Sequence, residues 1–418
     1  MKRERSIWLV WSVLLSVLLS VGTRVEAQSL TWLGTLPGGG YSEARGVSAD
    51  GSVVVGWSHN ASGQIRAFRW TSSGGMQDLG TLPGGDYSAA YGVSADGSVV
   101  VGHAGNASGQ IRAFRWTSSG GMQDLGTLPG GDYSAAYGVS ADGSVVVGWS
   151  NNASNQQRAF RWTPSGGMQD LGTLPDGDDS AAYGVSADGS VVVGQANDTS
   201  NMDSAFRWTL SGGMQDLGTL PGSDWSLAYG VSADGSVVVG WATDASGQAF
   251  AFRWTSSGGM QDLGTLPGSD WSLAYGVSAD GSVVVGWATD ASEQAFAFRW
   301  TSSDGMEDLN IAYASLLTDG SQLISAYALS PDGRYIVGWG YNAATGRDEA
   351  YLLDTGLPCF SHNGDVDNNG CVDDADLLAI LFAFGQSGNA LGRVDVNCDG
   401  TVDDADLLQV LFNFGSGC

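Results

Sequence analysis

The stretch of residues 92–102, GVSADGSVVVG, decides the fold of most of this chain. It recurs unchanged in six copies spaced 46 residues apart, and the glycine after its aspartate lies at positions 51, 97, 143, 189, 235 and 281. A Phe-Arg-Trp triplet keeps the same step, with its tryptophan at positions 70, 116, 162, 208, 254 and 300. A step of about 40 to 50 residues that holds several short strands is typical of one blade of a β-propeller.

Each repeat reads as four short strands, and residues 42–82 serve as the example. The pair Asp50-Gly51 favours a tight two-residue turn between the first two strands. The valine run that follows is apolar on both sides, as expected for a strand buried between two neighbouring blades. The third strand is predicted at residues 65–71 and the fourth at residues 76–82.

An arginine and an aspartate recur on either side of the last turn of each repeat. Counting outward from residues 72–75 places Arg69 opposite Asp78, and an equivalent pair is Arg253 with Asp262. Opposite charges at facing positions stabilise a hairpin by about 0.2–1 kcal/mol. We therefore expect these pairs to set the strand register; a ring of catalytic carboxylates is the functional alternative.

A weaker seventh unit follows the six copies. Residues 324–354 repeat the first three strands after an insertion of six residues, but the fourth strand is missing there. Its sequence occurs near the N-terminus, where residues 30–37 match residues 78–83. We therefore predict an all-β, seven-bladed β-propeller over residues 28–356, closed by an N-terminal strand, because closure hides exposed sheet edges.

The N-terminus has the order of a secretory signal peptide over residues 1–27. Lys2, Arg3 and Arg5 precede an apolar run of about 15 residues and a small-residue pattern that ends at Ala27. We expect cleavage near Ala27 and a protein that is secreted or held at the cell surface, with no membrane span after cleavage. A retained membrane anchor is the alternative, although the run is short for a span of ~20 residues.

Charge and cysteine content narrow the classes of partner. Residues 1–27 carry four basic and two acidic side chains, so their removal changes the formal net charge from −27 to −29. Such a surface repels nucleic acid and anionic membranes. All four cysteines, Cys359, Cys371, Cys398 and Cys418, lie in the last 60 residues. Export favours disulfides between them, and three pairings are open.

The repeat resembles the extracellular HAF-repeat family, which is named for a His-Ala-Phe triplet. The frame Gly-Val-Ser-x-Asp-Gly-Ser-x-Val-Val-Gly and the ending Asp-Leu-Gly match over roughly residues 29–356. The histidine is absent here, since the first triplet position is occupied by Arg66, Arg112, Arg158, Ser204, Phe250, Phe296 and Glu349. The resemblance implies an exported protein and carries no known activity with it.

Two series of positions vary inside the constant frame, and most of their members are aromatic. The residue after the valine strand is Trp57, His103, Trp149, Gln195, Trp241, Trp287 or Trp339. The loop between blades carries Tyr41, Tyr87, Tyr133, Asp179, Trp225 or Trp271. Aromatic rings around a propeller rim can stack on sugar faces or on a protein partner. Packing in the core is the alternative.

The last 60 residues contain two loops with the spacing of calcium ligands. Calcium takes six to eight oxygens that converge on one point, with a glycine at loop position 6 for the sharp turn. The predicted ligands are Asp365, Asp367, Asn369, Cys371, Asp373 and Asp376 in the first loop, and Asp395, Asn397, Asp399, Thr401, Asp403 and Asp406 in the second. Cys371 and Thr401 would contribute backbone carbonyls. We predict two bound calcium ions.

Each loop leads into one amphipathic helix, predicted at residues 374–384 and 404–414. The duplicated loop and helix, with aspartate at loop position 12, resemble a type I dockerin, a small all-α calcium-binding domain, over residues 357–418. The resemblance implies docking onto a cohesin-like receptor or cell-surface scaffold, commonly in assemblies that degrade polysaccharide. Asp374-Ala375 and Asp404-Ala405 replace the Ser-Thr type pair that usually selects the receptor.

The sequence favours a secreted, non-catalytic repeat protein that presents a binding or structural surface and is attached through its C-terminal domain. His59, His103 and His362 lie in no nucleophile or zinc pattern, and no Gly-x-Ser-x-Gly elbow occurs. A carbohydrate-active component is the alternative, because glycoside hydrolysis needs only two carboxylates. A purely architectural protein without a small ligand is the third class.

Overall fold

The computed structural model describes residues 28–197, 202–356, 364, 366, 372–386, 394–396 and 401–416. The predicted signal peptide and all four cysteines lie outside the described residues. Contacts divide the chain into two compact units, of which the larger is Ser29–Thr355 and the smaller includes the C-terminal helices.

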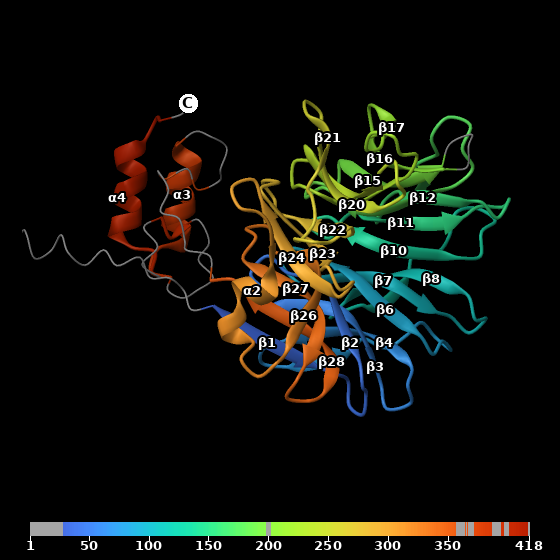
Figure 1. Cartoon of the computed structure of the whole chain (residues 1–418), viewed down its shortest axis with the longest axis horizontal. Helices are drawn as coiled ribbons and strands as arrows, with labels where there is room; N and C mark the ends of the chain where they lie inside the picture. The colour runs from blue at the N-terminus through green and yellow to red at the C-terminus, as the bar shows by residue number, and fades with distance from the viewer. Residues whose placement is uncertain are drawn as a thin grey trace, which may run out of the picture. The chain divides into compact units, whose positions relative to one another are not determined.

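Seven four-stranded antiparallel sheets form the larger unit, arranged as the blades of a propeller (Figure 1). Each of the first six blades uses four consecutive strands, paired in chain order. Their bounds are β2 (Ser42–Val47), β3 (Val53–His59), β4 (Ile65–Thr71) and β5 (Gly75–Asp78); β6 (Ser88–Val93), β7 (Val99–Gly105), β8 (Ile111–Thr117) and β9 (Gly121–Asp124); β10 (Ser134–Val139), β11 (Val146–Asn151), β12 (Gln157–Thr163) and β13 (Gly167–Asp170); β14 (Ser180–Val185), β15 (Val191–Asn197), β16 (Asp203–Thr209) and β17 (Gly213–Asp216); β18 (Ser226–Val231), β19 (Val237–Thr243), β20 (Ala249–Thr255) and β21 (Gly259–Asp262); β22 (Ser272–Val277), β23 (Val283–Thr289), β24 (Ala295–Thr301) and β25 (Gly305–Asp308).

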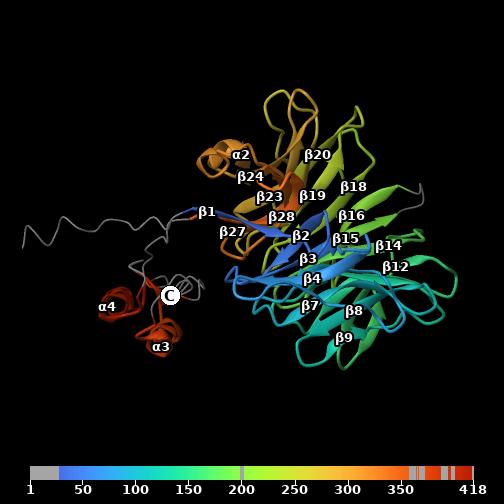
Figure 2. The ribbon, with the colours of Figure 1, turned by 90° about the horizontal axis from the view of Figure 1, so that it is seen from below.

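The seventh blade joins the two ends of this unit. It consists of β26 (Gln322–Leu329), β27 (Tyr335–Asn342), β28 (Arg347–Asp354) and β1 (Ser29–Gly34). Strand β1 pairs antiparallel with β28 (Figure 2), and the Ala350 N–H donates to Ser42 Oγ of the first blade at 2.8 Å. The predicted seven-bladed propeller, closed by an N-terminal strand, is confirmed.

The first hairpin of each blade has a longer loop than the Asp-Gly pair predicts. The Ser48 N–H donates to Val53 O at 2.9 Å, so four residues, 49–52, connect the two strands. Asp50 Oδ1 accepts hydrogen bonds from Ser48 Oγ at 2.7 Å and from the Ser52 N–H at 3.0 Å. The serine and the aspartate of the repeat therefore hold a wider turn than the two-residue turn expected.

The predicted ion pair between Arg69 and Asp78 is wrong. Asp78 lies opposite Phe68, and Arg69 lies opposite Gln77, because the loop between these strands has three residues rather than four. Arg69 Nε instead donates to Gly97 O of the next blade at 3.4 Å. The arginine thus connects adjacent blades instead of setting the register within one.

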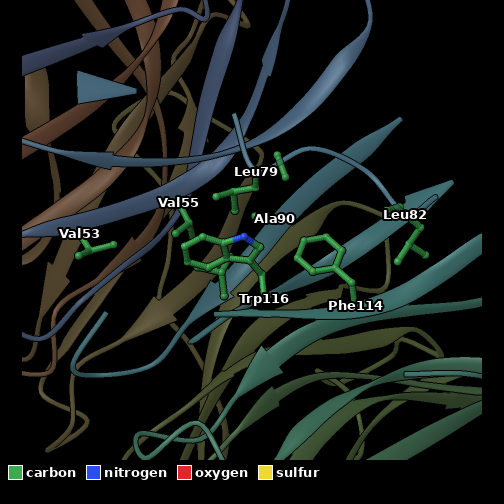
Figure 3. Packing of buried hydrophobic residues seen from close by; sticks show 10 residues of the cluster. Val53, Val55, Leu79, Leu82, Ala90, Phe114 and Trp116 are labelled. Carbon is green, nitrogen blue, oxygen red and sulfur yellow. The ribbon is translucent and has the colours of Figure 1, made fainter. Parts of the chain in front are cut away.

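The core lies between the blades. Trp116 and Phe114 of the second blade pack among Val55, Leu79 and Leu82 of the first (Figure 3). Phe114 is fully buried, and burying such a side chain stabilises the fold by roughly 1.5–3 kcal/mol. Because the same cluster recurs between other neighbouring blades, the Phe-Arg-Trp triplet of the repeat supplies the contact that joins them.

Four short helices complete the described structure. The insertion before the seventh blade contains α2 (Leu309–Ala312) and the 3₁₀ helix η1 (Ala314–Leu316), and the smaller unit contains α3 (Asp374–Ala383) and α4 (Asp404–Asn413). Both C-terminal helices begin at the expected residues. Within the described part of the chain, no helix has the length and apolar character needed to cross a membrane.

Candidate functional site

A β-bulge in the innermost strand of every blade places one residue at the wall of the central channel. In β2, Ala44 lies opposite Gly56 and Gly46 opposite Val55, so Arg45 has no partner in the ladder. A bulge leaves such a residue unpaired and redirects its side chain. The bulged residues are Arg45, Tyr91, Tyr137, Tyr183, Tyr229, Tyr275 and Tyr327.

These seven side chains form a closed ring. The centroids of neighbouring tyrosine rings lie between 4.9 and 5.3 Å apart, in tilted or edge-on arrangements. Arg45 closes the gap, since its Cζ lies 3.6 Å from the Tyr327 ring centroid and 5.9 Å from that of Tyr91. Aromatic pairs and cation–π contacts each add about 0.5–1.5 kcal/mol, so the ring is a preformed wall.

A carboxylate found at this place only in the first blade holds Arg45. Arg45 Nη2 donates to Glu43 Oε2, and the Tyr41 hydroxyl donates to Glu43 Oε1 at 2.6 Å. The equivalent residues of blades two to six are Ala89, Ala135, Ala181, Leu227 and Leu273. Burial opposes the charge of Arg45, but Tyr327 and Glu43 hold its pKa above the usual value, so the guanidinium stays charged.

The residues that follow the valine run, among them Trp287 and Trp339, form a second tier of side chains, which packs against the hydroxyl groups of this ring. The Trp287 Nε1–H donates to the Tyr275 hydroxyl at 3.0 Å, and the Trp339 Nε1–H donates to the Tyr327 hydroxyl at 3.2 Å. Burial raises the pKa of Tyr275 and Tyr327, so both hydroxyls stay protonated at neutral pH. The series predicted from the repeat therefore supports the channel wall and lies half-buried.

His103 takes the place of tryptophan in the second blade. Its ring stacks on Tyr87 and Tyr91, with centroids 5.4 and 5.2 Å away, and its Nε2 lies 3.0 Å from the Tyr87 hydroxyl. Burial lowers the pKa of His103 to about 4. The imidazole is therefore neutral at pH 7.

The second predicted series forms the rim at one end of the channel. Tyr41 stacks on Trp57 with centroids 5.2 Å apart, which joins the rim to the second tier. Trp225, Trp271 and Tyr133 expose 46, 45 and 42 % of their surface. These three side chains are too exposed to serve as core filler, which favours the binding interpretation for the rim.

Sequence reasoning missed the tyrosine ring itself. Its signal was present, because Arg45 and the first five tyrosines keep the 46-residue step and each precedes a glycine. In a regular strand, successive side chains point to opposite faces of the sheet. The bulge interrupts this alternation, and only for that reason do these side chains turn into the channel. A search of the repeat for tyrosine-glycine pairs would have found it.

Six of the twelve predicted calcium ligands lie among the described residues. These are Asp373, Asp376, Asp395, Thr401, Asp403 and Asp406; the other six, Asp365, Asp367, Asn369, Cys371, Asn397 and Asp399, lie outside them. Within the described residues alone, no three acidic, histidine or cysteine side chains group closely enough to hold a metal ion.

The described members of the two predicted ligand sets occupy equivalent places at the two C-terminal helices. Asp376 accepts hydrogen bonds from the Asp373 N–H at 2.9 Å and the Val366 N–H at 2.6 Å, and Asp406 accepts one from the Asp403 N–H at 2.9 Å. Both carboxylates are fully buried. Burying a carboxylate is costly unless a cation or hydrogen-bond donors compensate it, and here backbone N–H groups supply such donors.

Helices α3 and α4 each expose an apolar face. Their buried sides meet in a small core that includes Ile380 and Val410. The exposed residues repeat with a step of 30: Leu378, Leu381, Phe382 and Phe384 on the first helix, and Leu408, Leu411, Phe412 and Phe414 on the second. Phe382 and Phe412 expose 82 and 83 % of their surface. Apolar faces exposed to this extent are typical of surfaces that bind a partner.

No family model matches the sequence, and no curated protein matches it. Among solved structures, oligogalacturonate lyase from Vibrio parahaemolyticus superposes with a TM-score of 0.50 and 11 % identity, over 78 % of this chain and 93 % of the lyase. The β-propeller domain of the Trilobed protease from Pyrococcus furiosus has a TM-score of 0.47 and 9 % identity, over 75 and 95 % of the two chains.

TolB from Acinetobacter baumannii has a TM-score of 0.39 and 16 % identity; the match covers 51 % of this chain and about half of TolB, 52 %. At such identities a similarity bears on the fold alone and on no activity.

Proposed function

We propose that this chain is a secreted, non-catalytic binding protein whose propeller presents a ligand-binding face and whose C-terminal unit attaches it to a receptor. The observation that carries the proposal is the exposed aromatic rim of Trp225, Trp271 and Tyr133 above the ordered channel wall. Such rings stack on the apolar faces of sugars and also anchor protein partners. Polysaccharide is the ligand class that we favour.

The state of the channel residues supports binding without chemistry. A general base needs a free carboxylate or an imidazole whose pKa lies near the working pH. The Glu43 carboxylate is engaged by Arg45 and Tyr41, and the pKa of His103 is lowered to about 4. The carboxylate is therefore occupied by its two partners, and the imidazole is a weak base.

Glycoside hydrolysis is the second candidate, because one carboxyl pair on the rim favours it. Burial raises the pKa of Asp203; the hydrogen bond from Trp225 lowers it in part, and the charge of Asp179 raises it again. The Trp225 Nε1–H donates to Asp203 Oδ2 at 3.4 Å, so an exposed indole lies beside this pair. A carboxyl with a raised pKa near a second carboxyl is the arrangement that glycosidases use.

The C-terminal unit supports attachment through calcium and an apolar interface. The buried carboxylates of Asp376 and Asp406 are part of the two predicted calcium sites, and bound calcium would stabilise this unit. The repeated apolar faces of the two helices fit a receptor surface of the cohesin-like kind. Export through a signal peptide would bring the protein to the cell surface or the medium, where such a receptor is found.

Binding of the mature protein to immobilised glycans, with product analysis on the same samples, tests the propeller role. We expect retention without release of reducing sugar, and we expect Trp225→Ala together with Trp271→Ala to lower retention at least tenfold, because each stacked aromatic contributes about 1–3 kcal/mol. The Leu210→Ala variant, which changes an exposed side chain on another loop, is the control. Unchanged retention in the double tryptophan variant would show that the rim is not the glycan-binding surface.

Release of reducing sugar would instead support the hydrolase. In that case Asp203→Asn should abolish product formation and leave glycan retention in place, because asparagine cannot donate the proton that a leaving group needs. If neither retention nor release occurs on any glycan, the binding proposal fails and the architectural class remains.

A further inference from the structure

A cavity of about 250 Å³ lies in the central channel below the tyrosine ring. The Gly-Val pair of the innermost strand lines it in each of the first six blades, and Ala328 and Leu329 line it in the seventh. Of the ring residues it reaches only Arg45 and three neighbours in the same arc, Tyr91, Tyr275 and Tyr327. All seven blades therefore line the cavity, and it meets the ring only on the side of Arg45.

Arg45 is the only charged side chain among the described residues that line this cavity. Glu43 binds it through Nη2 but does not line the cavity. Arg45 Nε is buried with no hydrogen-bond partner in the described structure. A buried donor without an acceptor is costly, and the fold nevertheless retains a guanidinium whose donors are only partly satisfied.

The other residues that line the cavity indicate what kind of molecule could reach this guanidinium. Valine side chains, tyrosine rings and the unpaired edges of the innermost strands surround it. The volume lies just below the roughly 300–1,000 Å³ of pockets for drug-sized ligands, so it suits a molecule with one ring or a short chain. A guanidinium binds carboxylates and phosphates through paired hydrogen bonds, and a carboxylate brings less charge into a cavity with so much apolar lining.

We infer that the central channel binds a small organic carboxylate, with its carboxylate on Arg45 and its body between the valine row and the tyrosine ring. This site is separate from the aromatic rim and does not depend on glycan binding there.

The pair Glu43 and Arg45 allows a matched set of variants. Glu43→Ala together with Arg45→Tyr turns residues 42–47, SEARGV, into SAAYGV, which is the sequence of β6 and β10, so this double variant has the inner strand of blades that already fold. Glu43→Ala alone leaves the guanidinium without its internal carboxylate. Tyr275→Phe keeps Arg45 and removes one ring hydroxyl.

Isothermal titration of the mature full-length protein tests the site with two carboxylates and their uncharged counterparts, benzoate with benzamide and glucuronate with glucose. We expect at least one carboxylate to bind at least tenfold more tightly than its counterpart, as one charge-assisted contact of roughly 1.5–3 kcal/mol requires. We expect Glu43→Ala to bind it more tightly than the wild type, because no internal carboxylate competes. The double variant should lose binding.

Thermal melting separates this site from a purely structural ion pair. The same carboxylate should raise the melting temperature of Glu43→Ala more than that of the wild type, and it should not change that of the double variant. Tyr275→Phe should keep the preference for the carboxylate. Equal affinities for charged and uncharged probes, binding unchanged in the double variant, or no binding of either carboxylate at millimolar concentration would each overturn the inference.

Discussion

His103 shows how a single residue of this protein couples burial to pH. Its pKa in the folded chain, about 4, lies below the value of about 6.5 expected in the unfolded chain. As the pH falls, the unfolded chain is protonated first, so stability is lost between about pH 6.5 and pH 4, by on the order of 2–3 kcal/mol. Above this window the neutral histidine carries no such penalty.

The variant His103→Gln isolates this effect, because the fourth blade already carries Gln195 at the same position. We expect the free energy of unfolding of the wild type to fall more steeply with decreasing pH than that of the variant, only within this window. Chemical denaturation at a series of pH values measures both slopes. Parallel slopes would mean that His103 is protonated in the folded protein as readily as in the unfolded one.

At the scale of the elements, the first hairpin of each blade also sets the spacing between blades. Gly143 has φ of +71°, and a Cβ atom there would lie 2.5 Å from Val99 Cγ2 of the preceding blade. Gly121, in an outer hairpin, has φ of +64° and nothing within 4 Å of such an atom. Both glycines therefore have left-handed backbone, but only Gly143 lies close to a side chain of the neighbouring blade.

Gly143→Ala and Gly121→Ala form a matched pair for this contact. We expect Gly121→Ala to lower the free energy of unfolding by about 1–2 kcal/mol, the cost of left-handed backbone. Gly143→Ala should lose a further ~1–3 kcal/mol, because it also overpacks the blade interface. Denaturation of both variants measures the difference; equal losses would show that the neighbouring blade yields to the methyl group.

At the scale of the whole molecule, the two compact units differ in how they are stabilised. The propeller buries an aromatic and valine cluster between its blades, whereas in the described part of the C-terminal unit the buried apolar residues are few and small, such as Val372 and Val402. A unit with so little buried apolar surface needs a metal or disulfides for stability. Calcium would supply this through the predicted loops.

We therefore expect EDTA to lower or remove the melting transition of the C-terminal unit and to leave that of the propeller unchanged. Differential scanning calorimetry of the mature protein, with and without calcium, measures both transitions. Asp376→Asn together with Asp406→Asn should make the transition of the C-terminal unit insensitive to calcium. A C-terminal transition that is the same in EDTA and in calcium would contradict calcium binding.

The sequence predicted the architecture well because the repeats have a constant length and a constant order of strand and turn residues. The step of 46 residues, the valine run and the match between residues 30–37 and 78–83 led directly to seven blades and to the closing strand. The prediction about Arg69 was wrong because a loop one residue shorter moves every facing pair by one position. Register depends on the loop geometry, which composition alone does not define.

The sequence by itself determined the propeller, its blade count and the aromatic character of the variable positions, because these follow from periodicity and residue type. Only the tertiary structure decided that Arg45 and six tyrosines share one ring, and that this arginine both binds Glu43 and lines a cavity that Glu43 does not line. The physical reason is the bulge in each innermost strand: one unpaired residue interrupts the alternation of the strand and turns its side chain into the channel.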